Sequence, residues 1–213
     1  MEPILCVKNI SKKIKNNLIL DDISFTVNKG EIMGIKGRNG SGKSMLFKAL
    51  TGLIALDKGE VRVFGKSINE ENALSEIGAL IEYPGFLPNF TGKKNLLMLA
   101  SIRNAISEDA IIEAMQKLKL DPNNKLPYKK YSIGMRQKLG IAAAIMELPK
   151  LLFLDEPCNN LDVESAALVH EILRKLNKEN NTTIIMASHN VSDFEMLCTT
   201  MCEIKSGRLE VIQ

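Results

Sequence analysis

The sequence lacks any long hydrophobic run, and this absence limits the classes of protein it can belong to. Of its 213 residues 45% are hydrophobic, which is ample for a core. No apolar stretch approaches the roughly 20 residues that a membrane-spanning helix needs. The first residues also lack the basic and apolar segments of a secretory signal peptide. We therefore expect one α/β domain with an inserted subdomain, located in the cytoplasm.

The chain also lacks a charge excess of either sign. Its 28 basic and 25 acidic residues leave a formal net charge of +3, and the lysines are scattered along the sequence. Attraction to a polyanion needs a clustered basic surface. We therefore expect no nucleic-acid partner.

Cysteine and histidine are scarce, with four and two residues. Cys198 and Cys202 would share one face of a helix if residues 191–202 were helical. No group of cysteines and histidines completes the tetrahedral ligand set of a structural metal site, so we interpret the cysteines as reduced, mostly buried thiols. His170 falls in the middle of a predicted helix with no evident partner, and the sequence assigns it no role.

What the sequence does contain is a complete phosphate-binding loop between a predicted strand at 31–35 and a predicted helix at 45–50. The loop consists of Gly37, Arg38, Asn39, Gly40, Ser41, Gly42, Lys43 and Ser44. Its glycines let backbone N–H groups surround the β- and γ-phosphates, Lys43 adds a positive charge, and the Ser44 hydroxyl can bind Mg²⁺. The N-terminal end of the helix adds its dipole. The motif predicts a nucleoside triphosphate site.

The pattern of apolar residues predicts how the rest of the chain is organised. Alternation at 4–7 and 19–27 indicates an antiparallel β layer ahead of the loop. Helical spacing between 89 and 146 indicates an inserted group of helices. The continuous apolar runs at 151–154 and 183–187 are typical of central strands in a parallel sheet that is covered on both faces.

Polar side chains follow both of these central strands, at the edge where ligands of open α/β sheets bind. Asp155 is placed to hold Mg²⁺, and Glu156 to orient or deprotonate an attacking water. Such an acidic pair can alternatively cap a helix or face solvent. His189 can donate a hydrogen bond to the γ-phosphate, although a single histidine is more often structural.

A further motif, Tyr-Ser-Ile-Gly-Met at 131–135, precedes a predicted helix at 138–146. Ser132 suits an N-cap and Gly134 a flexible helix start. In this order the motifs resemble those of the nucleotide-binding subunit of ABC transporters, over nearly the whole chain. The segment 131–135 corresponds to the family's Leu-Ser-Gly-Gly-Gln signature, of which it keeps the serine and the second glycine. Asp155 and Glu156 correspond to Walker B and its glutamate, residues 160–162 to the D-loop, and His189 to the switch histidine.

The resemblance implies an α/β fold of the P-loop NTPase class, with a RecA-like core of mainly parallel sheet, an N-terminal antiparallel β layer and an inserted α-helical subdomain. It implies a single ABC ATPase domain over 1–213. Within it, 1–84 and 150–213 form the nucleotide-binding core, and 85–149 the helical subdomain with the signature motif.

The resemblance also implies partners and cofactors. ATP and Mg²⁺ would lie between two subunits in a head-to-tail homodimer or heterodimer, so that Ser132 and Gly134 of one subunit face the phosphate loop of the other. A helix that begins near Ser132 cannot easily reach its own loop across the inserted helices, yet its N–H groups suit a γ-phosphate held by another subunit. Catalysis would fall to Glu156, His189 and Lys43.

One or more membrane permease subunits would complete the transporter and place this subunit on the inner face of the cell membrane. Residues 86–91 and the helix after them are the predicted docking surface, although their apolar side chains could equally be plain core. A soluble ABC-type ATPase that is not coupled to transport is the alternative function. A degenerate ATP-binding regulator is disfavoured because the catalytic residues are all present.

Two positions depart from the family pattern. Glu82 stands where the family usually has a glutamine that contacts Mg²⁺; its carboxylate still offers oxygen to the metal. Ile14 stands where many relatives stack an aromatic ring on adenine, so we expect weaker discrimination between ATP and GTP. Glu82, the residues at 89–91 and the signature segment resemble the subgroup of ABC ATPases associated with bacitracin and lantibiotic export or self-protection. The permease, not this chain, would contact the transported substance, so a peptide antibiotic is implied by the resemblance alone.

Overall fold

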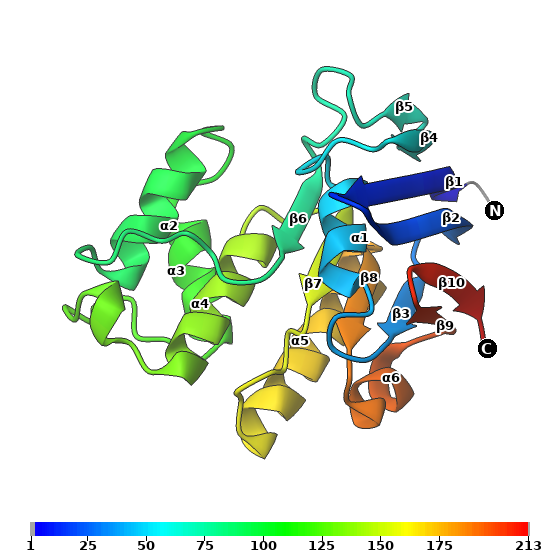
Figure 1. Ribbon diagram of the computed structural model, residues 1–213. Helices are drawn as coiled ribbons and strands as arrows, with labels where there is room; N and C mark the ends of the chain where they lie inside the picture. Colours follow the sequence, from blue (N-terminus) through cyan, green and yellow to red (C-terminus); the bar gives the residue numbers. More distant parts are fainter. Residues whose placement is uncertain (1–2, 213) are drawn as a thin grey trace.

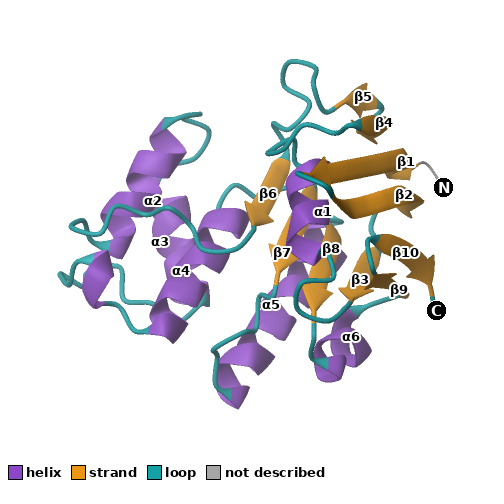
Figure 2. Cartoon of the chain, in the orientation of Figure 1, coloured by secondary structure: helices purple, strands orange, loops and turns teal. Residues whose placement is uncertain are grey.

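The computed structural model describes residues 3–212, which form two β-sheets, helices that pack against them and a group of helices to one side (Figures 1 and 2). The first sheet has the strand order β2-β1-β4-β5, with bounds Asn17–Asn28, Pro3–Ile14, Lys58–Val63 and Lys66–Ser67. The second has the order β10-β9-β3-β8-β7-β6, with bounds Arg208–Val211, Thr200–Lys205, Ile32–Lys36, Thr183–Ser188, Leu151–Asp155 and Ile77–Leu80.

The described part of the chain has six α-helices and one short 3₁₀ helix. Their bounds are Lys43–Leu50 for α1, Gly92–Ser101 for α2, Glu108–Lys117 for α3, Tyr128–Lys130 for the 3₁₀ helix, Ile133–Ile145 for α4, Val163–Asn180 for α5 and Val191–Leu197 for α6. Helices α2, α3 and α4 lie together beside the sheets (Figure 1). The predicted α/β class, with an antiparallel layer and an inserted helical subdomain, is confirmed. No helix within residues 3–212 combines the length and the apolar character needed to cross a bilayer.

The second sheet is parallel at its centre, where β3, β8, β7 and β6 are neighbours. Every residue of β7 and β8 is buried, because both faces of these strands are covered. In the strand register Asp155 lies opposite Ala187, and Ala187 opposite Ile35. The three strands therefore end at one edge of the sheet, where the residues that follow them meet.

Helix α1 joins the two sheets. Its apolar residues belong to a hydrophobic cluster that includes side chains of both sheets, and the ring of Phe47 meets that of Phe153 on β7 edge-on at 5.8 Å between centroids. Burying such aromatic pairs contributes more than their contact area alone. This packing fixes the position of the phosphate loop, which leads directly into α1.

Several elements differ from their predicted bounds. Helix α4 begins at Ile133, five residues earlier than predicted, because Ser132 caps it through its Oγ. Helix α6 ends at Leu197 and β9 begins at Thr200, so Cys198 and Cys202 do not share a helix face as considered from the sequence. All four cysteines are free thiols, of which Cys202 is buried and the other three are half-buried.

At Gly78 on β6 the parallel sheet packs closely against the helical subdomain. A Cβ at this position would collide with the carbonyl oxygen of Ala144 on α4 and lie 2.8 Å from Cγ of Pro149. Backbone atoms cannot move aside as a side chain can. Gly85 is exposed and has no atom within 4 Å of the same built position, so it provides a matched control.

We predict that Gly78→Ala lowers the free energy of unfolding by about 1–3 kcal/mol, the usual cost of overpacking. Gly85→Ala should leave it unchanged or raise it slightly, because alanine restricts the unfolded chain. Urea unfolding followed by circular dichroism measures both. Equal stability of the two variants would show that β6 and α4 are not packed as closely as described.

Candidate active site

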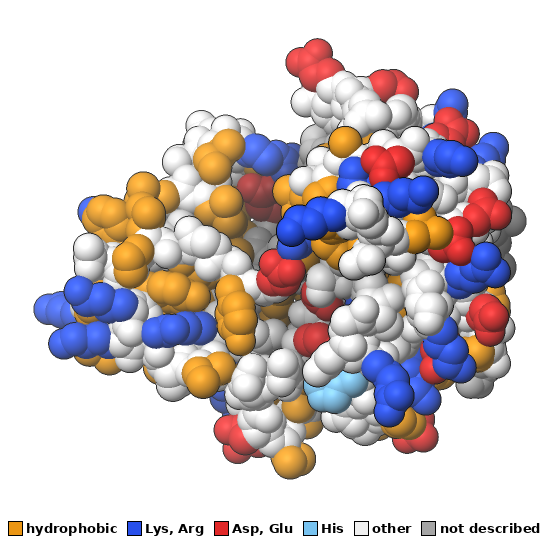
Figure 3. Space-filling view, viewed as in Figure 1, with side chains coloured by type: hydrophobic (Ala, Val, Ile, Leu, Met, Phe, Trp, Pro, Cys, Tyr) orange, Lys and Arg blue, Asp and Glu red, His pale blue; other side chains and the backbone are white. Residues whose placement is uncertain are grey.

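A cleft of about 570 Å³ lies at the carboxyl edge of the parallel sheet. The phosphate loop lines it with Arg38, Asn39, Gly40, Gly42, Lys43 and Ser44, and other elements contribute Glu82, Gln137, Asp155 and Glu156. In the space-filling view acidic side chains surround the hollow between the helices and the sheets (Figure 3). The structure thus brings the phosphate loop and the predicted acidic residues together in one place.

The backbone of the phosphate loop adopts conformations that favour glycine. Gly40 and Gly42 have φ angles of 78° and 110°, in the region that residues with a Cβ rarely enter. Gly42 also occupies the N-cap of α1, and no side chain caps the helix there. The first N–H groups of α1 therefore point toward the cleft with the positive end of the helix dipole, an arrangement that suits an anion such as phosphate.

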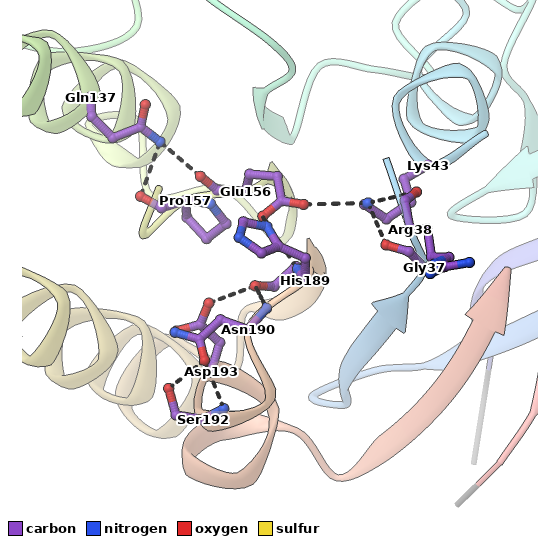
Figure 4. A network of polar contacts seen from close by, with 11 residues as sticks. Gly37, Arg38, Lys43, Gln137, Glu156, Pro157, His189, Asn190, Ser192 and Asp193 are labelled. Atoms are coloured by element: carbon purple, nitrogen blue, oxygen red, sulfur yellow. Dashed lines mark hydrogen bonds and ion pairs between the residues drawn. The ribbon is translucent and has the colours of Figure 1, made fainter. Parts of the chain in front are cut away.

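Lys43, the first residue of α1, is 6% exposed and holds its charge at the base of the cleft. Its Nζ donates to the carbonyl oxygen of Gly37 at 2.7 Å and to that of Arg38 at 3.4 Å. It also lies 3.3 Å from Oε1 of Glu156 (Figure 4). A buried ammonium group needs such compensating partners.

Glu156 links the phosphate loop to His189. Its second carboxylate oxygen, Oε2, lies 2.7 Å from Nδ1 of His189 and accepts the backbone N–H of the same residue at 3.3 Å. Glu156 has a φ of 51°, a conformation that costs energy for a non-glycine residue and often marks functional sites. The three residues predicted as catalytic, Lys43, Glu156 and His189, therefore form one continuous network (Figure 4).

The predicted metal ligands offer oxygen atoms to the same cleft. Asp155 is 7% exposed, and its buried Oδ1 has no hydrogen-bond partner. Burial raises the pKa of the Asp155 carboxyl group, and a hydrogen bond from the side chain of Ser44 opposes that shift. A buried, unpaired carboxylate oxygen beside a hydroxyl fits a hard cation such as Mg²⁺.

Glu82, the third predicted metal ligand, follows β6 with a φ of 55° and lines the cleft. Its carboxylate forms an ion pair with Nζ of Lys48 on α1 at 2.7 Å. The side chain of Glu82 is 54% exposed, and exposed ion pairs contribute little to stability. Its carboxylate can therefore exchange this partner for another at small cost.

Ser132, Gly134 and Ile14 lie outside this cleft. Ser132 is exposed, and its Oγ accepts the N–H of Met135; a Cβ on Gly134 would lie 3.5 Å from the carbonyl oxygen of Asn160. Ile14 ends β1 and is 42% exposed. Ile14 was predicted to contact the base of the nucleotide, but the isoleucine that lines the cleft is Ile19 on β2.

Sequence reasoning missed the role of Gln137. Its Nε2 donates to the carbonyl oxygens of Glu156 and Pro157, each at 3.0 Å (Figure 4). These bonds attach α4 to the segment that carries Glu156. The available signal was a polar residue on the otherwise apolar face of a helix, which usually bonds to a buried partner.

The structure gives His170, to which the sequence assigned no role, a partner. The residue is 7% exposed on α5, and its Nε2 lies 2.8 Å from Oδ1 of Asp193 on α6. Its partner lies 23 residues further along the chain, so only the packing of α5 against α6 brings the two together.

Comparison with known proteins places this fold and cleft in a family. Residues 20–159 match the family described as ABC transporter. YybJ of Bacillus subtilis, an uncharacterized ABC transporter ATP-binding protein, is 40% identical over 205 residues, which cover 96% of this chain and 94% of that protein. The bacitracin transport ATP-binding protein BcrA of Enterococcus faecalis is 37% identical, with 98% and 68% covered. The lantibiotic transport ATP-binding protein SrtF of Streptococcus pyogenes is 32% identical, with 97% and 89% covered.

Solved structures agree on the fold. The dimeric, post-hydrolysis structure of the ATP-binding cassette MJ0796 bound to ADP and Pi has a TM-score of 0.87 at 23% identity, over 98% of this chain and 99% of that one. The ADP conformation of MJ1267, an ATP-binding cassette of an ABC transporter, has a TM-score of 0.82 at 25% identity, over 99% and 90%. The resemblance inferred from the motifs, including that to bacitracin and lantibiotic transport ATPases, is confirmed. The chain therefore belongs to the ABC transporter family, as one of its ATP-binding ATPase subunits.

Proposed function

We propose that this subunit powers the export of a substrate through a separate membrane permease, by hydrolysing ATP between two head-to-tail subunits. The observation that carries the proposal is the network of Lys43, Glu156 and His189 at a cleft that also holds Asp155 and Ser44. The relatives named for bacitracin and lantibiotic transport support a peptide antibiotic as the substrate.

The contacts within the cleft suggest how the residues act. The phosphates of ATP bind at the N-terminus of α1, where Lys43 exchanges its contact with Glu156 for phosphate oxygens. Release from Lys43 leaves the Glu156 carboxylate free to accept a proton from the attacking water, while its contact with His189 keeps it oriented. Ser44 and Asp155 would hold Mg²⁺, with Glu82 nearby, and the bound ion would neutralise charge on the β- and γ-phosphates.

The second subunit, in a homodimer or a heterodimer, would supply Ser132 and Gly134. Both lie at the N-terminal end of α4, away from the cleft of their own chain. Ile133 between them is 57% exposed, which is costly for an isoleucine in water. A partner that covers this helix end would bury the isoleucine and bring a phosphate to the N–H groups of α4.

The permease would dock in an apolar groove of about 490 Å³ between the end of β6 and α2. Leu87, Met98, Leu99 and Ile102 line it and are 41%, 43%, 41% and 77% exposed. Such a cluster of exposed apolar side chains is typical of an interaction site. Docking would hold the subunit peripherally at the inner face of the cell membrane. The alternative function, a soluble ATPase that is not coupled to transport, does not explain why this groove is apolar and exposed.

We predict that Glu156→Gln binds ATP as tightly as the wild type but loses about 10²–10⁴-fold in hydrolysis rate, because an amide cannot accept the proton. ATP should trap the variant as a dimer, which size-exclusion chromatography with light scattering detects. Glu71→Gln, at an exposed position, serves as the control. Normal turnover in Glu156→Gln would remove this residue from the chemistry.

We predict that Glu82→Gln raises the Mg²⁺ concentration for half-maximal ATPase activity by about threefold to tenfold, or about 0.7–1.4 kcal/mol. The amide oxygen carries no formal charge and binds a hard cation less tightly. Lys48→Met should not raise this concentration, because it removes only the competing partner of Glu82. If both variants match the wild type in Mg²⁺ dependence, Glu82 is not a ligand of the metal.

We predict that Ile102→Asp abolishes copurification of an integral membrane permease from membrane extract, while the ATPase activity of the isolated subunit is retained. The new charge lies in the groove, and burying it against an apolar partner is unfavourable. Val211→Asp, which is 67% exposed on β10, is the matched control. Retained copurification of Ile102→Asp would place the docking surface elsewhere.

A further inference from the structure

Cys158, His170 and Asp193 meet in the interior, close to the segments that carry Glu156 and His189. Cys158 follows β7, His170 lies on α5 and Asp193 on α6. Nε2 of His170 lies 3.4 Å from Sγ of Cys158 and 2.8 Å from Oδ1 of Asp193. The three ligand atoms all lie within 4.8 Å of one another. None of the three lines the ATP cleft.

The cluster is buried and its carboxylate is held in place. His170 is 7% and Asp193 2% exposed, and Cys158 is half-buried. Oδ2 of Asp193 accepts a hydrogen bond from the Ser188 hydroxyl at 2.7 Å, so Oδ1 is directed at His170. Hydrogen bonds of this kind, from outside the ligand set, orient the ligands of protein metal sites.

We propose that Cys158, His170 and Asp193 form a binding site for a divalent transition-metal ion of the zinc class. One thiolate, one imidazole and one carboxylate are the donors that Zn²⁺ prefers, and three protein ligands leave the fourth tetrahedral position to water. The cleft beside the phosphate loop offers oxygen donors from Ser44 and Asp155, which suit Mg²⁺ instead. The two sites therefore differ in the ion that each selects.

Metal binding would exchange one set of interactions for another. Burial, together with the negative charge of Asp193, raises the pKa of the Cys158 thiol, so this thiol stays protonated without a metal. On binding, the thiol proton would pass to solvent, and the proton with which Nε2 of His170 now bonds Asp193 would be replaced by one on Nδ1, so that the imidazole stays neutral. Sγ and Nε2 would then each donate an electron pair to the ion, and one Asp193 oxygen would complete the set. The ion replaces the hydrogen bonds that now connect the three side chains.

The position of the site gives it a consequence for the chain. The side chains of Glu156 and His189 are in contact. Cys158 comes two residues after Glu156, and Asp193 comes four residues after His189. An ion shared by Cys158 and Asp193 would connect these two segments a second time, through coordinate bonds. Binding to the folded chain alone stabilises it by mass action.

Cobalt provides a direct test, because a cysteine thiolate bound to Co²⁺ gives a charge-transfer absorption in the near ultraviolet. We expect the reduced, full-length chain, in excess Mg²⁺, to bind one Co²⁺ with this absorption and to release it on addition of Zn²⁺. Cys158→Ser should remove the absorption, and His170→Asn should weaken Co²⁺ binding by at least about tenfold. Cys6→Ser, on β1 and outside the cluster, should match the wild type.

Cys198 requires its own control, because it too lies near Asp193: burial, and after it the negative charge of Asp193, raises the pKa of this thiol to about 12. Cys198→Ser should keep the absorption. The site is refuted if the wild-type chain shows no charge-transfer absorption, or if Cys158→Ser retains it. Should Cys158→Ser fail to fold, the wild-type spectrum decides, because a chain without the site shows only the spectrum of hydrated Co²⁺.

Discussion

The geometry of the cleft depends on the register of three adjacent parallel strands, β7, β8 and β3. In this register Asp155 pairs with Ala187, and Ala187 pairs with Ile35. Each strand delivers the next residues of the chain to the same edge: Glu156 after β7, His189 after β8 and the phosphate loop after β3. A shift of one residue in any strand would turn its side chains to the opposite face. The complete burial of β7 and β8 makes such a shift costly.

Charged side chains also lie at this edge of the sheet, and their neighbours do not fully neutralise them. Lys43 is balanced by two carbonyl oxygens and by Glu156, but the buried Oδ1 of Asp155 has no partner and Glu156 adopts a left-handed backbone conformation. Buried polar groups without partners cost free energy. The packing of the sheet and α1 supplies the stability that holds this arrangement, so these charged groups are fixed in position before any ligand binds.

The sequence predicts the local features of the chain well and its long-range contacts poorly. The phosphate loop, the Ser132 cap and the acidic residues after β7 are contiguous motifs whose geometry depends on neighbouring residues, and the comparisons confirm the family they indicated. Two sets of contacts join residues that lie 12 to 35 positions apart in the sequence. They are the bonds from Gln137 to the Glu156 segment and the cluster of Cys158, His170 and Asp193. Their partners are set by how α4, α5 and α6 pack, which no short pattern encodes.

Long-range contacts also connect the helical subdomain to the candidate site. Gln137 bonds α4 to the backbone beside Glu156, and Gly78 lets α4 pack directly on β6. These contacts are buried, so α4 and the segment that carries Glu156 are packed as one unit. Glu82 and Lys48 connect the end of β6 to α1 through an exposed ion pair, which is weak and easily exchanged. A ligand that competes for Glu82 therefore replaces this ion pair at small cost, whereas the buried bonds between α4 and the Glu156 segment hold independently of it.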